Sequence, residues 1–166
     1  MKKFELTGEF ITNIFGKKLF RIRALVAFGN VEAGELGGYV EKEENLSDDG
    51  NAWVSGDAQV FGDARVSGDA RVSGDAQVFG DARVFGDARV FGDADILQIT
   101  GLGTVHRTTT VFRTPDGIRI ACGCFFGDLD AFWAQVKNTR YGKVRREYLK
   151  FAELVEIYFG EDKEDE

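Results

Sequence analysis

The chain has 166 residues, of which 43% are hydrophobic and 30% are charged, and its formal net charge at pH 7 is −7. This length suits a single domain, or two small units packed compactly, and the acidic balance argues against a general nucleic-acid-binding surface. No apolar run reaches the roughly 18 residues of a membrane span, and no continuous apolar region follows the basic pair at the start, so neither a membrane helix nor a signal peptide is expected. The only cysteines, Cys122 and Cys124, are too close in a strand for an unstrained disulfide, which favours a reducing, cytoplasmic setting.

Residues 3–28 have the pattern of two β-strands. Positions 20–24 alternate between apolar residues and arginine, which is the period of a strand with one buried face. Residues 16–18, Gly-Lys-Lys, are a plausible turn between the strands. We expect residues 1–35 to form a β-hairpin that caps the open end of a following β-structure, because unpaired strand edges invite aggregation.

Residues 50–97 read in sixes as eight consecutive hexapeptides of the form Gly-Asp-Ala-x-Val-x. A six-residue unit cannot bury its own apolar side chains, so its stability must come from stacking. The period predicts a β-helix in which each unit supplies one short strand and one corner, and three units close a triangular coil of about 18 residues. Gln59 and Gln77 are 18 residues apart, and each is followed two positions later by Phe, which agrees with that coil length.

Side-chain size predicts the role of each position in the hexapeptide. The β-branched Val or Ile should point inward, and the small Ala should fill the narrow corner. Gly supplies the backbone freedom of a tight corner, and the Asp after it is expected to cap the turn by accepting hydrogen bonds from backbone N–H groups. Val40 and Leu46 lie six apart, but Leu46 lies eight before Val54, so we predict an irregular first coil with two extra residues in the loop 47–50.

This pattern resembles the hexapeptide-repeat left-handed β-helix family, whose best-known members are acyltransferases and γ-class carbonic anhydrases. The segments 37–47 (GGYVEKEENLS) and 110–127 (TVFRTPDGIRIACGCFFG), together with the GDARV repeats, are similar to a group of hexapeptide proteins common in phages and bacterial prophages. The resemblance implies a left-handed parallel β-helix, placed here at residues 36–103. It also implies a phage or prophage origin, and therefore the cytoplasm of a host cell as the location.

The hexapeptide rhythm ends after Leu97. Residues 104–114 and 117–126 are predicted to form a hairpin around the turn Thr-Pro-Asp-Gly, and the second strand should place five side chains on one face. These are Ile118, Ile120, Cys122, Cys124 and Phe126. Asp128 is the expected N-cap of an amphipathic helix, and a second helix is predicted over about 143–159. The fold class is therefore mainly β, with a small C-terminal ββαα module over residues 104–166 that ends in an acidic tail.

The histidine content argues against enzymatic activity. The acyltransferases use a histidine as general base and the γ-class carbonic anhydrases use three as zinc ligands, whereas this chain has only His106, in a predicted strand. Cys122 and Cys124 are too few for a closed zinc site, and their shared face with Ile118 and Ile120 indicates core packing. We therefore expect no catalytic residue, no metal and no cofactor, with a hexapeptide acyltransferase-like enzyme as an alternative.

Large apolar side chains at the outward position after Val predict a binding face. With an 18-residue coil, Phe61, Phe79 and Leu97 line one face of the β-helix, and Phe85 and Phe91 lie on the other two faces. Exposed apolar groups of this size need to be covered, either by other segments of the chain or by a partner. The expected function is a non-enzymatic interaction or scaffold protein that binds a partner protein, with inhibition of a host system as one consequence, or that self-associates as a dimer or trimer.

Two charged patterns offer further candidates. The repeated Asp residues form columns along the corners, for which turn capping is the favoured interpretation and a DNA-mimicking surface or a calcium array are alternatives. A basic cluster lies between and within the predicted helices, and it could bind phosphate with Tyr141 as a stacking partner. Its candidate phosphate-binding residues are Arg140, Lys143, Arg145 and Arg146. A nucleotide-binding or nucleotide-sequestering protein is therefore a second alternative.

Overall fold

The computed structural model describes residues 2–160, and the chain divides into two compact units between Ile96 and Leu97. The first unit begins with the antiparallel strands β1 (Phe4–Thr12) and β2 (Lys18–Ala24), and β2 also pairs antiparallel with β3 (Leu36–Val40). The hairpin thus extends the sheet of the first coil by hydrogen bonding to its edge. A 3₁₀ turn, η1 (Glu43–Asn45), follows β3.

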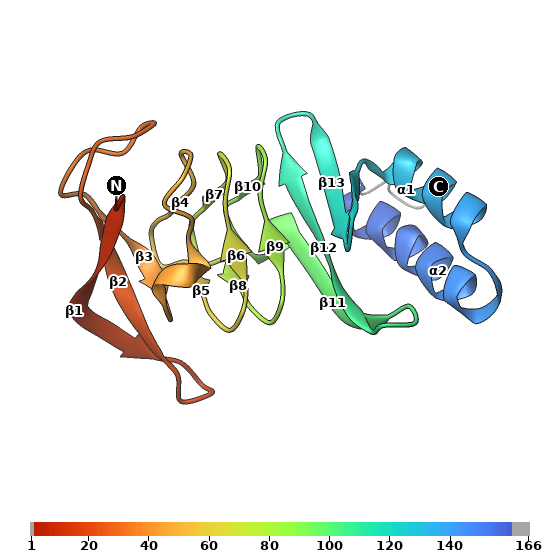
Figure 1. Ribbon diagram of the computed structural model, residues 1–166, viewed down its shortest axis with the longest axis horizontal. Coiled ribbons are helices and arrows are strands. Elements are labelled where there is room, and N and C mark those ends of the chain that lie inside the picture. Colours follow the sequence, from red (N-terminus) through yellow and green to blue (C-terminus); the bar gives the residue numbers. More distant parts are fainter. Residues whose placement is uncertain (1, 161–166) are drawn as a thin grey trace, which may run out of the picture. The chain divides into compact units, whose positions relative to one another are not determined.

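Seven two-residue strands build the middle of the chain, and they wind as successive coils in Figure 1. They are β4 (Trp53–Val54), β5 (Gln59–Val60), β6 (Arg65–Val66), β7 (Arg71–Val72), β8 (Gln77–Val78), β9 (Arg83–Val84) and β10 (Arg89–Val90). They pair in parallel on three faces, with the orders β3-β5-β8, β4-β7-β10 and β6-β9. Partners among the seven short strands lie 18 residues apart, as Val60 and Val78 do, so the predicted coil length is confirmed.

The irregular first coil is also confirmed. Val40 pairs with Val60 and Leu46 with Val66, both 20 residues apart, whereas Val54 pairs with Val72 at the regular 18. The two extra residues therefore lie between Leu46 and Val54, which agrees with the predicted loop 47–50. The coil interior is built as expected, since every repeat Val from Val54 to Val90 and every repeat Ala from Ala52 to Ala88 is fully buried.

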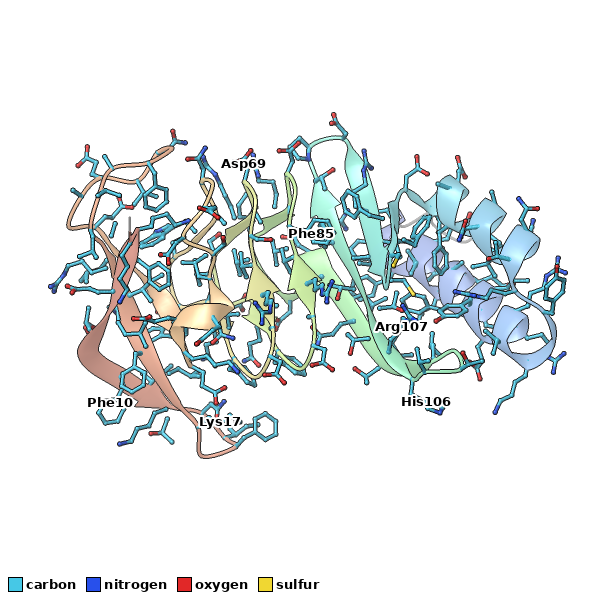
Figure 2. All side chains as sticks on the ribbon, in the orientation of Figure 1. Phe10, Lys17, Asp69, Phe85, His106 and Arg107 are labelled. Atoms are coloured by element: carbon cyan, nitrogen blue, oxygen red, sulfur yellow. The ribbon has the colours of Figure 1, made fainter. Side chains whose placement is uncertain are left out.

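The predicted turn capping by Asp is wrong for most of the repeat. At most corners the hydrogen bonds are formed by the backbone: the Ala58 N–H donates to the Ser55 carbonyl at 3.3 Å, and the Asp57 N–H donates to the Gly74 carbonyl of the next coil at 3.0 Å. Asp93 is an exception, since its carboxylate accepts from the Gln77 N–H at 3.2 Å. Within residues 2–160, the carboxylates of Asp57, Asp69, Asp75, Asp81 and Asp87 accept no hydrogen bond. Figure 2 shows one of them, Asp69, pointing outward from its corner.

The last hexapeptide does not form a regular coil. Its Asp and Ala residues enter a second 3₁₀ turn, η2 (Asp93–Asp95), and Ala94 is exposed rather than packed inside. Strand β11 (Ile96–Leu102) then pairs with β12 (Arg107–Thr114). Residues 97–102, assigned above to the β-helix, are therefore part of the C-terminal sheet.

The C-terminal unit is a four-stranded antiparallel sheet with two helices. The sheet order is β11-β12-β13-β14, with β13 (Gly117–Cys122) and β14 (Phe125–Gly127), so the predicted two strands are four. The segment 117–126 is not one strand, because it reverses at Gly123-Cys124 and pairs Cys122 with Phe125. The predicted single face from Ile118 to Phe126 is therefore wrong, and Phe126 pairs with Ala121 instead.

Helices α1 (Leu129–Thr139) and α2 (Gly142–Phe159) complete this unit. Asp128 is the N-cap of α1, as predicted, and accepts from the Ala131 N–H at 2.8 Å. The core of the unit joins both helices to the sheet. It contains Val111, Ile120, Cys122, Phe132, Val136, Tyr148, Phe151, Ala152 and Val155. Between residues 2 and 160, neither helix is long and apolar enough to cross a membrane, and the predicted acidic tail lies outside the described residues.

Candidate functional site

An aromatic row, defined as Phe15, Phe61 and Phe79, crosses the β3-β5-β8 face of the first unit. Phe61 and Phe79 stack with ring centroids 5.3 Å apart, and the ring centroid of Phe15 lies 6.3 Å from that of Phe61. Phe61 is only 5% exposed, whereas Phe79 is 40% and Phe15 67% exposed. The row therefore has a buried centre and two solvent-exposed ends.

The centre of the row is covered by the N-terminal hairpin. Phe61 packs in a small core with Leu19 and Tyr39, against which Ile11 also lies. The loop between β1 and β2 carries Phe15 and Ile14, and Ile14 is 94% exposed. The tip of this loop therefore places two large apolar side chains in contact with solvent.

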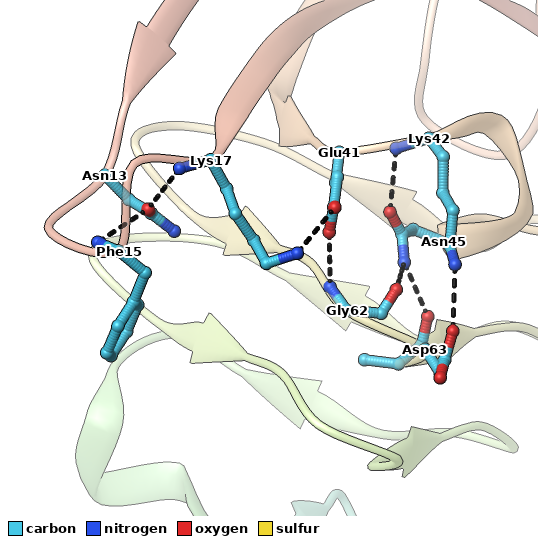
Figure 3. A network of polar contacts seen from close by, with 9 residues as sticks. Asn13, Phe15, Lys17, Glu41, Lys42, Asn45, Gly62 and Asp63 are labelled. Atoms are coloured by element: carbon cyan, nitrogen blue, oxygen red, sulfur yellow. Dashed lines mark hydrogen bonds and ion pairs between the residues drawn. The ribbon is translucent and has the colours of Figure 1, made fainter.

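A polar network fixes this loop to the first coil (Figure 3). The Asn13 Oδ1 accepts from the backbone N–H groups of Phe15 and Lys17, each at 3.0 Å. Lys17 Nζ then pairs with Glu41 Oε1 at 3.1 Å, and Glu41 Oε2 accepts from the Gly62 N–H at 2.7 Å. The network links the loop to the corner directly after Phe61, so it holds Phe15 in place beside Phe61.

The Glu41 carboxylate is the central group of the network. Burial alone would raise its pKa, but the hydrogen bonds from the Gly62 N–H and from Lys17 outweigh that effect and lower it. The ionised form is therefore the one that joins hairpin and coil.

A second branch of the network anchors the same corner. Asn45 is fully buried, and its Nδ2 donates to the carbonyl oxygens of Gly62 at 3.1 Å and Ala64 at 2.9 Å. Its Oδ1 accepts from the Lys42 N–H at 2.9 Å, while Lys42 Nζ pairs with Asp63 at 2.9 Å. Both the oxygen and the nitrogen of the Asn45 amide thus serve to align η1 with the coil below it.

The other predicted face residues lie in different places. Leu97 lies in β11 and packs against the core of the C-terminal unit rather than extending the row of Phe61 and Phe79. Phe85 is half-buried after β9. Phe91 is more than half exposed, and it lines a groove of about 500 Å³ with Trp53 and others on the β4-β7-β10 face.

The C-terminal unit contains a cavity system of its own. Two adjoining cavities of about 210 and 230 Å³ share Arg107, Arg140 and Tyr148 in their walls. Arg107 comes from the start of β12, Arg140 from the end of α1, and Tyr148 from α2. Apolar side chains of Phe125, Phe132 and Val136 line the first cavity.

Tyr148 lies in the walls of both cavities. The pKa of Tyr148 is raised to about 12, mainly by burial and to a smaller extent by a hydrogen bond with Cys122. The positive charges of Arg107 and Arg140 act in the opposite direction. The Cys122 thiol donates to the Tyr148 hydroxyl at 3.7 Å, and that hydroxyl donates to the Leu102 carbonyl at 3.5 Å. Cys122 belongs to the core, whereas Cys124 is exposed at the hairpin turn.

The predicted phosphate-binding residues are only partly brought together. Arg140 lines both cavities and Tyr141 lines the second, whereas Arg145 and Arg146 line neither. Lys143 lies 3.9 Å from Glu147 on the exposed side of α2. Sequence reasoning missed Arg107. It begins β12 and Arg140 follows α1, so the two residues are far apart in the sequence and only the fold brings them to the same cavities.

The prediction that His106 lies in a strand is wrong. His106 lies in the turn between β11 and β12, with a backbone φ of 51°. Its ring is exposed (Figure 2). Its Nδ1 lies 2.9 Å from the Gly101 carbonyl oxygen. Over residues 2–160, no three His, Cys, Asp or Glu side chains are grouped to hold a metal ion.

Comparison with known families identifies the repeat. Residues 58–74, 64–80 and 76–92 match the family model described as the YdcK beta-solenoid repeat. These windows cover the regular coils β5 to β10 and well under half of the chain, so they identify a β-solenoid repeat and extend to neither the hairpin nor the C-terminal unit. A search of curated proteins finds no match.

Proposed function

We propose that the chain is a non-enzymatic scaffold protein whose first unit binds a partner protein through the aromatic row and the adjoining Ile14. The observation that supports this most is the continuity of the row. A buried Phe61 connects two exposed rings, Phe79 and Phe15, on backbone that is held by the Glu41 network. Rigid aromatic side chains that lose little entropy on binding are the groups that dominate protein interfaces.

The finer features of this proposal come from the sequence resemblance. We propose a left-handed coil, supported by the six-residue period and the three faces of two-residue strands. The phage-like segments 37–47 and 110–127 support a phage or prophage origin, with a host protein in the host cytoplasm as the partner and inhibition of a host system as one consequence. An acyltransferase activity receives less support, because His106 is exposed in a turn and bonds to a backbone carbonyl.

Co-purification with matched variants tests the proposal. Phe79→Ser and Phe15→Ser remove the two exposed ends of the row, and Phe91→Ser removes an exposed Phe from another face of the same solenoid. We expect wild type and Phe91→Ser to retain one partner protein and the two row variants to lose it, with affinity falling by about tenfold or more. Equal retention by all four folded proteins would refute the proposal.

A second copy of this chain is the competing occupant of the aromatic row. Light scattering on the purified chain separates the two possibilities. If wild type is a dimer or trimer that Phe79→Ser converts to a monomer, then a second copy covers the row and the partner-protein proposal fails. A monomer in both forms is the expected result.

A further inference from the structure

We propose that the cavity system of the C-terminal unit, around Arg107, Arg140 and Tyr148, binds a phosphate monoester that carries a planar apolar group, such as a nucleoside monophosphate. This site lies wholly within residues 97–160, and its proposed ligand is independent of the protein-binding face proposed for the first unit.

Of the residues that the structure describes, two arginines, Arg107 and Arg140, line these cavities, and no carboxylate lines them. Arg140 Cζ lies 6.0 Å from the centre of the Tyr148 ring, and Arg107 lines the same two cavities. In the part of the chain that the structure describes, neither side chain forms an ion pair or a hydrogen bond with an acidic residue. Two like charges on the wall of a partly buried space repel each other, and an anion between them would remove that cost.

The nearest acid along α2 is already engaged. The Glu147 Oε2 accepts from the Gly103 N–H at 3.1 Å, and Oε1 lies 3.9 Å from Lys143 Nζ. Glu147 therefore serves the β11–β12 turn and its own helix, and it does not neutralise Arg107 or Arg140. The positive charge of the cavity is left for a ligand.

Arg107 lies close against the Gly123-Cys124 turn. Gly123 has φ +58°, and a Cβ there would collide with the Arg107 guanidinium. The missing side chain at Gly123 thus leaves room for the Arg107 guanidinium against this turn. A side chain that is supported in this way loses little further freedom when it binds an anion.

The shape and lining of the cavities favour a phosphate ester over a simple anion. The guanidinium groups of Arg107 on β12 and Arg140 at the end of α1 can donate to different oxygens of a tetrahedral phosphate, whereas a single guanidinium group is enough to bind a carboxylate. Phe125, Phe132 and Val136 offer an apolar wall beside them. The two spaces of about 210 and 230 Å³ together reach the range of small-molecule sites, roughly 300–1,000 Å³.

Calorimetry on the full chain tests this site with defined probes: the four common nucleoside monophosphates, the matching nucleosides, inorganic phosphate and benzoate. We expect at least one monophosphate to bind more tightly than its nucleoside, than phosphate and than benzoate. Arg107→Gln and Arg140→Gln should each weaken it by about tenfold or more, because each removes one charged fork. Arg145→Gln and Arg146→Gln are the matched controls and should leave it unchanged.

A second measurement needs no variant. Cys124 lines the first cavity and is exposed, so a bound ligand should slow its alkylation in the wild-type protein. Absence of binding by all four monophosphates at millimolar concentration would overturn the proposal, and so would equal weakening by the control variants. Preferential binding of benzoate, or binding that leaves Cys124 fully reactive, would contradict the assigned ligand and location.

Discussion

Phe61 and Phe79 stack with their ring planes 11° apart and their centroids 5.3 Å apart, one above the other on consecutive coils. The stack is a direct product of the repeat, because β5 and β8 pair in parallel with Gln59 opposite Gln77. The hairpin then adds Phe15 to the covered side of Phe61. Sequence period, coil register and a loop from outside the repeat together produce the proposed binding face.

Acid should loosen the loop that carries Phe15. The folded-state pKa of Glu41 is below its usual value, so the stabilisation it provides is present at neutral pH and is lost as the pH falls from about 4.5 through that lowered value. Glu41→Gln should release the loop at neutral pH as well. Hydrogen exchange of residues 13–17 is expected to speed up by about tenfold or more in Glu41→Gln, since a charge-assisted hydrogen bond contributes about 1.5–3 kcal/mol.

Glu9→Gln is the matched control for this experiment. Glu9 is an exposed residue of β1, and its Oε1 lies 3.6 Å from the Arg21 Nε in an ion pair. Exposed ion pairs contribute at most about 1 kcal/mol, so exchange at residues 13–17 should stay near wild type. Equal exchange in Glu41→Gln and wild type would show that the network does not hold the loop.

Asn45 should be one of the most sensitive polar positions of the first unit. Asn45→Asp replaces the amide nitrogen with an oxygen that faces the carbonyls of Gly62 and Ala64. We expect the free energy of unfolding to fall by about 3 kcal/mol or more, and by about 1–3 kcal/mol in Asn45→Ala. Urea denaturation measures both effects. Asn51→Asp, at an exposed corner, is the control and should change the free energy of unfolding by less than about 0.5 kcal/mol.

The corner glycines should not tolerate a Cβ. Gly74 has φ +65°, and a Cβ there would lie against the carbonyl oxygen of Phe91 in the next coil. Gly74→Ala is expected to lower the free energy of unfolding by about 2 kcal/mol or more, because it combines backbone strain with a collision. Gly8→Ala, in a strand position with open space around it, should be neutral or slightly stabilising. A matching small effect at both positions would contradict the close approach of the coils.

The coils were predictable from the sequence, whereas the sites depend on pairings between distant segments. Val60 and Val78 could be aligned from period alone, but the contact of Phe15 with Phe61 requires the β2–β3 register. The turn at Gly123-Cys124 was missed because the alternation of apolar residues continues across it. Arg107 and Arg140 were not associated, because only the packing of α1 on the sheet brings them to one cavity.

The Asp residues of the hexapeptides show a second limit of prediction from sequence, namely that local turn propensity can mislead. Asp after Gly predicts turn capping, but in a stacked coil the backbone N–H groups at the corner already donate to the coil below, as Asp57 does to Gly74. At such a corner the carboxylate has no donor to cap, and that of Asp69 points outward. Local propensity was overruled by hydrogen bonding between coils.

The raised pKa of Tyr148 predicts a stability change at alkaline pH. Because the folded protein keeps this proton up to about pH 12 and the unfolded chain releases it near pH 10, the stabilisation is complete below about pH 10 and is lost as the pH rises toward 12. The difference in unfolding free energy between wild type and Tyr148→Phe should therefore decrease over this interval. Tyr141→Phe, at a well-exposed tyrosine, should follow wild type throughout, and a parallel course of wild type and Tyr148→Phe would contradict the assigned burial.

Site-specific photo-crosslinking tests the proposed binding face most directly. A photoreactive phenylalanine analogue placed at residue 79, 15 or 91 of the full chain would be activated in the cells that encode the protein, and the crosslinked protein would then be purified and titrated. We expect one and the same protein at positions 79 and 15, none at 91, and binding of that protein to wild type about tenfold or more tighter than to Phe79→Ser. Crosslinks to the chain itself, or to the same proteins at all three positions, would contradict a partner-binding role for the aromatic row.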